Sequence, residues 1–221
     1  MTGNKEYKIV AFDLDGTLTD PVRGLTSAFR YAFRKMGIDY KDEAVLKTFI
    51  GPPIRELWQQ MYGISREEAE RCVDYFREYY SVYGWWDNEI YDGIYELLSE
   101  LKASGKKIIL ATSKPDVHSS KILDKFDLSK FFDFKLGASF DGSREKKRDV
   151  LKYALDSIGV SDGELCECVL VGDTAYDAVG AREIGIDCIG VLWGYGSEAD
   201  LAENGAKHTV KTVAELRRLL L

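Results

Sequence analysis

Short apolar runs alternate with helical patterns along most of the chain. The runs are rich in β-branched residues and end at glycine or aspartate, which is typical of strands that are buried on both faces of a parallel sheet. They predict strands over residues 9–12, 108–111, 132–136, 169–171 and 188–192, with an edge strand over 208–210. Helices are predicted between them, over residues 94–104, 117–126, 148–158 and 175–184. This alternation predicts a doubly wound, mostly parallel α/β sheet of the Rossmann type.

One interval interrupts the alternation, because residues 21–86 show helical periodicity and no convincing strand. Its first helix is indicated by apolar residues that recur on one helical face, namely Ala28, Phe29, Ala32, Phe33 and Met36. Ser65-Arg66-Glu67-Glu68 has the pattern of a capping box and predicts a long helix through Tyr83. We therefore expect an α/β core of residues 1–20 and 87–221, with a small all-helical cap of residues 21–86 inserted after the first strand.

Composition narrows the partners without identifying one. The 221 residues are 45% hydrophobic and 30% charged, with a net charge of −7 and both signs interleaved. This balance argues against a nucleic-acid polymer or an anionic membrane as the main partner, but not against a small anion in a local pocket. Because the sequence shows neither a signal region nor a membrane-spanning stretch, we expect a cytoplasmic protein with reduced cysteines. Whether it is a monomer or a homodimer stays open.

Polar motifs follow the predicted strands. Asp13-Leu14-Asp15-Gly16-Thr17 follows the first, Thr112-Ser113-Lys114-Pro115 the second, and Gly172-Asp173-Thr174-Ala175-Tyr176-Asp177 the fourth. A basic cluster of Arg144, Lys146, Lys147 and Arg148 lies ahead of the helix before that fourth strand. Since parallel α/β sheets place ligands at the carboxyl ends of their strands, we expect carboxylates, a hydroxyl and a lysine on one rim.

This set of side chains suits phosphoryl transfer, in which catalysis consists mainly of positioning and of neutralising charge on the phosphoryl oxygens. Clustered carboxylates repel one another unless a cation joins them, and Mg²⁺ prefers a few carboxylates together with phosphate oxygen and water. A carboxylate can also attack phosphorus and form an aspartyl-phosphate. Asp13 and Asp15 are two residues apart on an extended segment, so both can face one substrate.

The motifs at Asp13–Thr17, Thr112, Lys147 and Gly172–Asp177 resemble, in order, the four motifs of the haloacid dehalogenase superfamily, and the resemblance covers essentially the whole chain. It implies that Asp13 is the nucleophile and that Asp15 is first the general acid and then the general base. Thr112 and Lys147 would hold the phosphoryl oxygens, although Lys146 remains an alternative to Lys147.

The same resemblance implies a magnesium site. Asp173 would bind Mg²⁺ together with the Asp13 carboxylate and the Asp15 carbonyl oxygen, and Asp177 would support the metal shell or orient the lysine. The neighbouring residues Leu14, Gly16 and Ser113 are expected to contact the substrate.

Several branches of the superfamily fit less well. The presence of Asp15 disfavours dehalogenation, and none of Lys35, Lys41 and Lys47 is marked as the Schiff-base lysine of a phosphonatase. The cap resembles that of phosphoglycolate phosphatases and of members described as 5′-nucleotidases. We therefore expect a Mg²⁺-dependent phosphatase that acts on a small phosphorylated metabolite. The alternatives are a hexose-phosphate mutase, which more often has valine where Thr17 stands, and a non-catalytic module that binds a phosphorylated metabolite.

The cap is expected to close over the site through linkers near residues 19–23 and 85–91. Arg55, beside Gly51-Pro52-Pro53, is the candidate for binding a carboxylate or second phosphate of the substrate, and the alternative is a plain surface arginine. Asp173 and Asp177 could also form a turn and a helix cap. Most of a further set of aromatic residues are expected to pack within the cap rather than stack on a nucleobase, namely Tyr75, Tyr79, Tyr80, Tyr83, Trp85 and Trp86.

Overall fold

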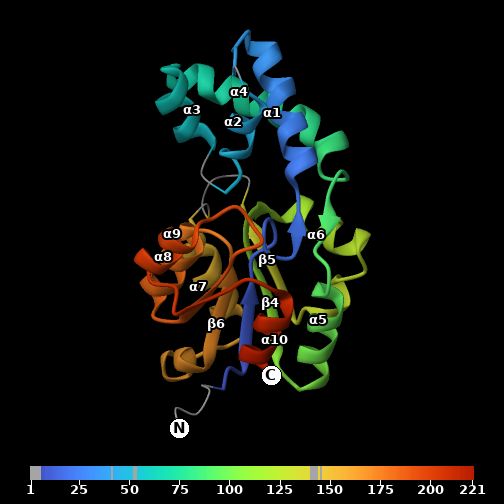
Figure 1. Cartoon of the computed structure of the whole chain (residues 1–221), viewed down its shortest axis with the longest axis vertical. Coiled ribbons are helices and arrows are strands. Elements are labelled where there is room, and N and C mark those ends of the chain that lie inside the picture. The colour runs from blue at the N-terminus through green and yellow to red at the C-terminus, as the bar shows by residue number, and fades with distance from the viewer. Residues whose placement is uncertain (1–5, 41, 52–53, 140–143, 145) are drawn as a thin grey trace. The chain divides into compact units, whose positions relative to one another are not determined.

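The computed structural model describes residues 6–221 apart from 41, 52–53, 140–143 and 145. The chain folds into two compact units (Figure 1). Unit 1 comprises Met1–Thr19 and Ile90–Leu221, and unit 2 comprises Asp20–Glu89. The chain passes between the units at two short strands that pair with each other, β2 (Thr19–Asp20) and β3 (Glu89–Ile90).

Unit 1 is built on a parallel sheet. In the described part of the chain this sheet has six strands in the order β5-β4-β1-β6-β7-β8, and every pair is parallel. The strands are β1 (Ile9–Phe12), β4 (Lys107–Pro115), β5 (Phe134–Ala138), β6 (Cys168–Gly172), β7 (Asp187–Val191) and β8 (His208–Val210). The order reverses between β1 and β6, which is the position where such sheets open a crevice at their carboxyl ends. The predicted doubly wound α/β fold is confirmed.

Helices cover both faces of this sheet (Figure 1). On one face, α7 (Lys147–Ser157), α8 (Ala175–Ile184) and α9 (Glu198–Glu203) bury apolar side chains against Ile9, Ala11 and Leu170. On the other face lie α5 (Ile94–Ala103), α6 (Asp116–Lys125) and α10 (Val213–Leu220). Two short 3₁₀ turns, Ser129–Phe131 and Asp162–Glu167, lead into β5 and β6. The sheet is therefore dry on both sides, and its polar groups gather at the strand ends.

Two strands differ from the sequence prediction by more than one residue at an end. β4 runs to Pro115, beyond the expected end at residue 111, and its register against β5 shifts between Ala111 and Pro115. β5 begins at Phe134 rather than at residue 132. The reason is the irregular end of β4: the strand continues past the shift, so Thr112, Ser113 and Lys114 belong to a bulged strand end and not to a loop.

Unit 2 contains the helices α1 (Val22–Met36), α2 (Glu43–Lys47), α3 (Ile54–Tyr62) and α4 (Arg66–Tyr79), followed by a π-helical turn over Tyr80–Gly84. The predicted capping box is present, with Ser65 and Glu68 each satisfying the other's backbone amide. The predicted helix through Tyr83 is present, since the chain stays helical to Gly84, but the α-helical part ends at Tyr79 and the last turn is π-helical. In the wider π turn the Gly84 carbonyl lies against Gly24 of α1, where a Cβ atom would come within 2.0 Å of it.

The core of unit 2 is aromatic. Phe29 and Phe33 of α1 contact the fully buried Trp58 edge to face, with ring centroids 5.9 and 5.3 Å apart. Of the aromatic residues predicted to pack here, Tyr80 is buried, whereas Tyr83 and Trp86 are exposed. No helix in the described part of the chain is both long and apolar enough to cross a membrane.

Candidate active site

The segment after β1 is a tight turn. The Asp13 amide extends the sheet by donating to the carbonyl of Val171 (2.9 Å), and the Leu14 carbonyl then accepts the amides of Thr17, Leu18 and Thr19. The Leu14 side chain is fully buried. Because successive side chains of an extended segment point in opposite directions, burial of Leu14 turns Asp13 and Asp15 away from the core. Leu14, expected to contact the substrate, could do so only through its backbone.

Lys147 joins two aspartates at this rim. It lies in the first turn of α7, and its ammonium group is 2.8 Å from Asp13 Oδ1, 2.8 Å from Asp177 Oδ1 and 3.1 Å from the Ala111 carbonyl oxygen. Its side chain is 4% exposed, whereas Lys146, one residue earlier, is exposed to solvent. The geometry thus brings Lys147 and not Lys146 to Asp13.

Asp177 has two partners. Its Oδ2 accepts hydrogen bonds from the amide (3.1 Å) and the hydroxyl (2.9 Å) of Thr174, which closes the N-terminus of α8, while Oδ1 faces Lys147. Asp177 therefore caps α8 and also lies beside Lys147.

The charges at the site perturb one another strongly. Burial opposes the charge on Lys147, but Asp13 and Asp177 outweigh it and hold the lysine pKa above its ordinary value. Burial and the nearby Asp177 and Asp13 carboxylates raise the pKa of Asp173 well above its usual range. Burial also raises the pKa of Asp177, against the opposing effect of Lys147. Negative charge is thus in excess over the single lysine within this group of residues.

These carboxylates fit a divalent cation. Among the residues that the structure describes, carboxylate oxygens of Asp13, Asp173 and Asp177 lie within 4.8 Å of one another, and all three side chains are largely buried. Hard oxygen donors with unneutralised charge are the ligands that Mg²⁺ prefers. The side chain of Asp15, also expected at the metal, is not in this cluster, so any contribution from Asp15 would come from its carbonyl oxygen, as the resemblance implies.

Asp173 lies in a cradle of glycines. A Cβ atom at Gly16 or Gly194 would lie 2.1 or 2.3 Å from its carboxylate. Its Oδ1 accepts the Thr17 hydroxyl (3.3 Å) and its Oδ2 the Tyr195 amide (2.8 Å). The sequence prediction did not include residues 193–196 in the site. The signal available was the pair of glycines that follows β7, because glycines next to a strand end permit close backbone approach.

The end of β4 supplies the remaining polar residues. Thr112 is buried and its hydroxyl accepts the amide of Lys114 (3.2 Å), whereas Ser113 is exposed. Lys114, which the sequence prediction left out of the site, forms an ion pair with Asp15 Oδ2. Burial raises the pKa of Asp15, and Lys114 opposes that shift.

Arg55 lies in unit 2, on α3, and pairs with Glu70 of α4 at 2.7 Å. Pro52 and Pro53, which precede it, lie outside the described residues, as does Lys41.

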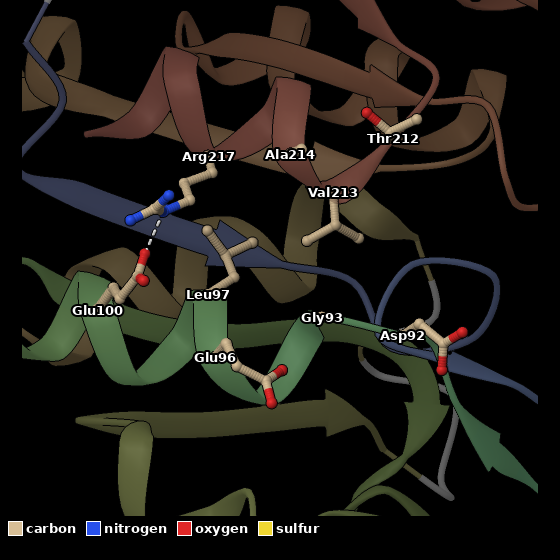
Figure 2. A pocket seen from close by; sticks show the side chains of 9 residues that line it. All are labelled: Asp92, Gly93, Glu96, Leu97, Glu100, Thr212, Val213, Ala214 and Arg217. Atoms are coloured by element: carbon tan, nitrogen blue, oxygen red, sulfur yellow. Dashed lines mark hydrogen bonds and ion pairs between the residues drawn. The ribbon is translucent and has the colours of Figure 1, made fainter.

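A separate groove lies between α5 and α10 (Figure 2). It encloses about 490 Å³ and has Leu97 and Val213 in its lining, with Glu100 and Arg217 paired at one end. A smaller pocket of about 240 Å³, lined in part by Tyr91 and Trp193, adjoins it. Neither contains the clustered carboxylates, so the chemistry at the ends of β1, β4 and β6 is not tied to either hollow.

Comparisons with known proteins agree with this geometry. The family model for haloacid dehalogenase-like hydrolases matches residues 10–191. A 5′-nucleotidase of Pseudomonas aeruginosa is 38% identical over 214 residues, which cover 97% of this chain and 96% of that protein. The tyrosine-protein kinase PtkA of Mycobacterium tuberculosis is 39% identical over 216 residues, covering 96% of this chain and 72% of that protein. A phosphoglycolate phosphatase of Caulobacter vibrioides is 28% identical over 194 residues, covering 86% and 81%.

A solved structure supports the same relationship. A predicted phosphatase from Clostridium acetobutylicum is 39% identical, with a TM-score of 0.90 over 96% of this chain and 97% of that one. The superfamily inferred from the four sequence motifs is confirmed, and the chain belongs to the haloacid dehalogenase-like hydrolase family.

Proposed function

We propose that this protein is a Mg²⁺-dependent phosphatase that hydrolyses a small phosphate monoester through an aspartyl-phosphate on Asp13. The observation that carries the proposal is the buried group in which Lys147 lies 2.8 Å from both Asp13 and Asp177, with Asp173 beside them. Family membership and the phosphatase names of several relatives support hydrolysis of a phosphoric monoester.

In the first step, a carboxylate oxygen of Asp13 attacks phosphorus and the bond from phosphorus to the leaving oxygen breaks. Asp15 donates a proton to that oxygen, so the product leaves as an alcohol. Thr112 and Lys147 hold the phosphoryl oxygens. Mg²⁺ bound by Asp13, Asp173 and the Asp15 carbonyl, with support from Asp177, would offset the negative charge that gathers there.

In the second step, a water molecule attacks phosphorus on the aspartyl-phosphate. Asp15, now ionised, takes a proton from that water, and the bond between phosphorus and Asp13 breaks. Inorganic phosphate leaves, and both aspartates return to their starting states. The exchange consumes one water molecule and needs no oxidant or reductant.

The finer proposal concerns the monoester. The 38% identity to a 5′-nucleotidase over nearly the whole of both chains favours a nucleoside monophosphate, and 2-phosphoglycolate is the second candidate. Unit 2 is proposed to act as the cap that selects between them. Arg55 is the proposed contact for a carboxylate or second phosphate, in exchange for its pairing with Glu70.

The direct experiment is a phosphate-release assay on nucleoside monophosphates, 2-phosphoglycolate and sugar phosphates, each with Mg²⁺ and with chelator. We expect release that needs Mg²⁺ and that falls about a thousandfold or more in Asp13→Asn, because the nucleophile is lost. Isomerised sugar phosphate without release would indicate a mutase instead. Folded, Mg²⁺-binding protein with no turnover would indicate a binding module.

Lys147→Met should destabilise the metal-free protein by about 3–5 kcal/mol, since it leaves buried carboxylates without their cation. Lys146→Met is the matched control, because its side chain is exposed, and it should change stability by no more than about 0.5 kcal/mol. Urea unfolding in chelator measures both free energies. Equal stabilities of the two variants would contradict the charge balance described here.

Arg55→Ala should raise KM for the preferred monoester about tenfold or more and leave kcat nearly unchanged, since a lost charge-assisted hydrogen bond is worth about 1.5–3 kcal/mol. Arg66→Ala, an exposed arginine of the same unit, is the control. The measurement is steady-state kinetics of both variants on the whole panel. If the two variants behaved alike on every substrate, Arg55 would not be part of the binding site.

A further inference from the structure

Lys114 is a buried charge at the end of β4. Its side chain is 5% exposed, and it pairs with Asp15 Oδ2, whose own side chain is 21% exposed. Burying an ammonium group is costly unless it is paired, because the group loses its solvation by water. The buried position of Lys114 therefore depends on its pairing with Asp15. A lysine needed only for solubility would not lie here.

The backbone around Lys114 fixes the orientation of this residue toward Asp15. The register of β4 against β5 shifts between Ala111 and Pro115, and such bulges re-aim side chains. The Thr112 hydroxyl accepts the amide of Lys114 at 3.2 Å. The Lys114 carbonyl packs against Gly137 of β5, where a Cβ atom would lie 2.2 Å from it. Three local features thus fix the residue whose side chain reaches Asp15.

The two aspartates of the turn after β1 therefore have separate lysines. Lys147 faces Asp13, and Lys114 faces Asp15. The pairing also leaves the two oxygens of Asp15 unlike each other. Oδ2 faces the ammonium group, whereas Oδ1 is buried and accepts no hydrogen bond from the residues that the structure describes. An unsatisfied buried oxygen is unfavourable unless another group uses it, such as a bound ligand.

From this geometry we infer that Lys114 is a positioning residue for the proton transfer of Asp15. Lys114 anchors Oδ2 and so presents Oδ1 to the leaving oxygen of the monoester. The inference rests on the proposed function, because it assigns a role within that reaction. Without the anchor, the Asp15 carboxyl group would rotate, and Oδ1 would lose its fixed direction.

The test compares two monoesters that differ in their need for a proton. The alcohol oxygen of an alkyl phosphate, such as a nucleoside monophosphate, leaves as a strongly basic alkoxide unless it is protonated. In p-nitrophenyl phosphate the leaving group is p-nitrophenolate, a stable anion that leaves without a proton. The first step is isolated by single-turnover measurement of leaving-group release, because Asp15 also acts as the base in the second step, which both monoesters share. In that measurement Lys114→Met should lower the rate for the alkyl phosphate about a hundredfold and the rate for p-nitrophenyl phosphate far less. Asp15→Asn should show the same selective loss, and the exposed Lys152→Met should show none.

Lys114→Arg keeps the charge and should restore part of the alkyl-phosphate rate, which also covers the case in which Lys114→Met does not fold. Equal losses on both monoesters in the Lys114 variants, with a selective loss in Asp15→Asn, would overturn the role of Lys114 alone. A wild-type protein that releases phosphate from neither monoester would overturn the proposed function and this role with it.

Discussion

Repulsion among buried carboxylates is the constraint around which this site is built. Asp13, Asp173 and Asp177 come from the ends of two neighbouring parallel strands and the start of a helix, and Lys147 from another helix joins two of them. Glycines in the surrounding backbone leave room for these side chains. Gly172 has no room for a Cβ atom beside Asp177, and Gly180 has none beside Lys147. Crowding of this kind excludes water and makes each charge depend on its neighbours.

The division of lysines between the aspartates fits the separate tasks proposed for the two carboxylates. Asp13 shares Lys147 with Asp177, next to the carboxylates that suit a cation. Asp15 pairs with Lys114 and is not among the three clustered carboxylates. A nucleophile needs charge neutralisation on the phosphoryl group, whereas an acid–base group needs a fixed direction toward the leaving oxygen. The two lysine pairs match these two requirements.

Much of the fold and of the candidate site could be predicted from the sequence, wherever the signal was local. Strands β1 and β8 lie where their apolar runs indicate, and the capping box at Ser65 marks a true helix start. The partner of Lys114 could not be predicted, because the inward direction of that side chain depends on a register shift against β5. The sequence analysis did not predict helices α9 and α10. A signal for α10 was present in Thr212, whose hydroxyl caps the helix by accepting the Glu215 amide. Lys147 was separable from Lys146 only by burial.

The most direct test of the central claim is to trap the covalent intermediate during turnover. Acid quenching of the wild-type protein with its preferred monoester and Mg²⁺, followed by borohydride reduction, converts an aspartyl-phosphate to homoserine, which mass spectrometry of peptides can locate. Our account predicts homoserine at position 13 and at no other aspartate. Homoserine at another position, or an actively turning-over enzyme that yields none, would contradict Asp13 as the nucleophile.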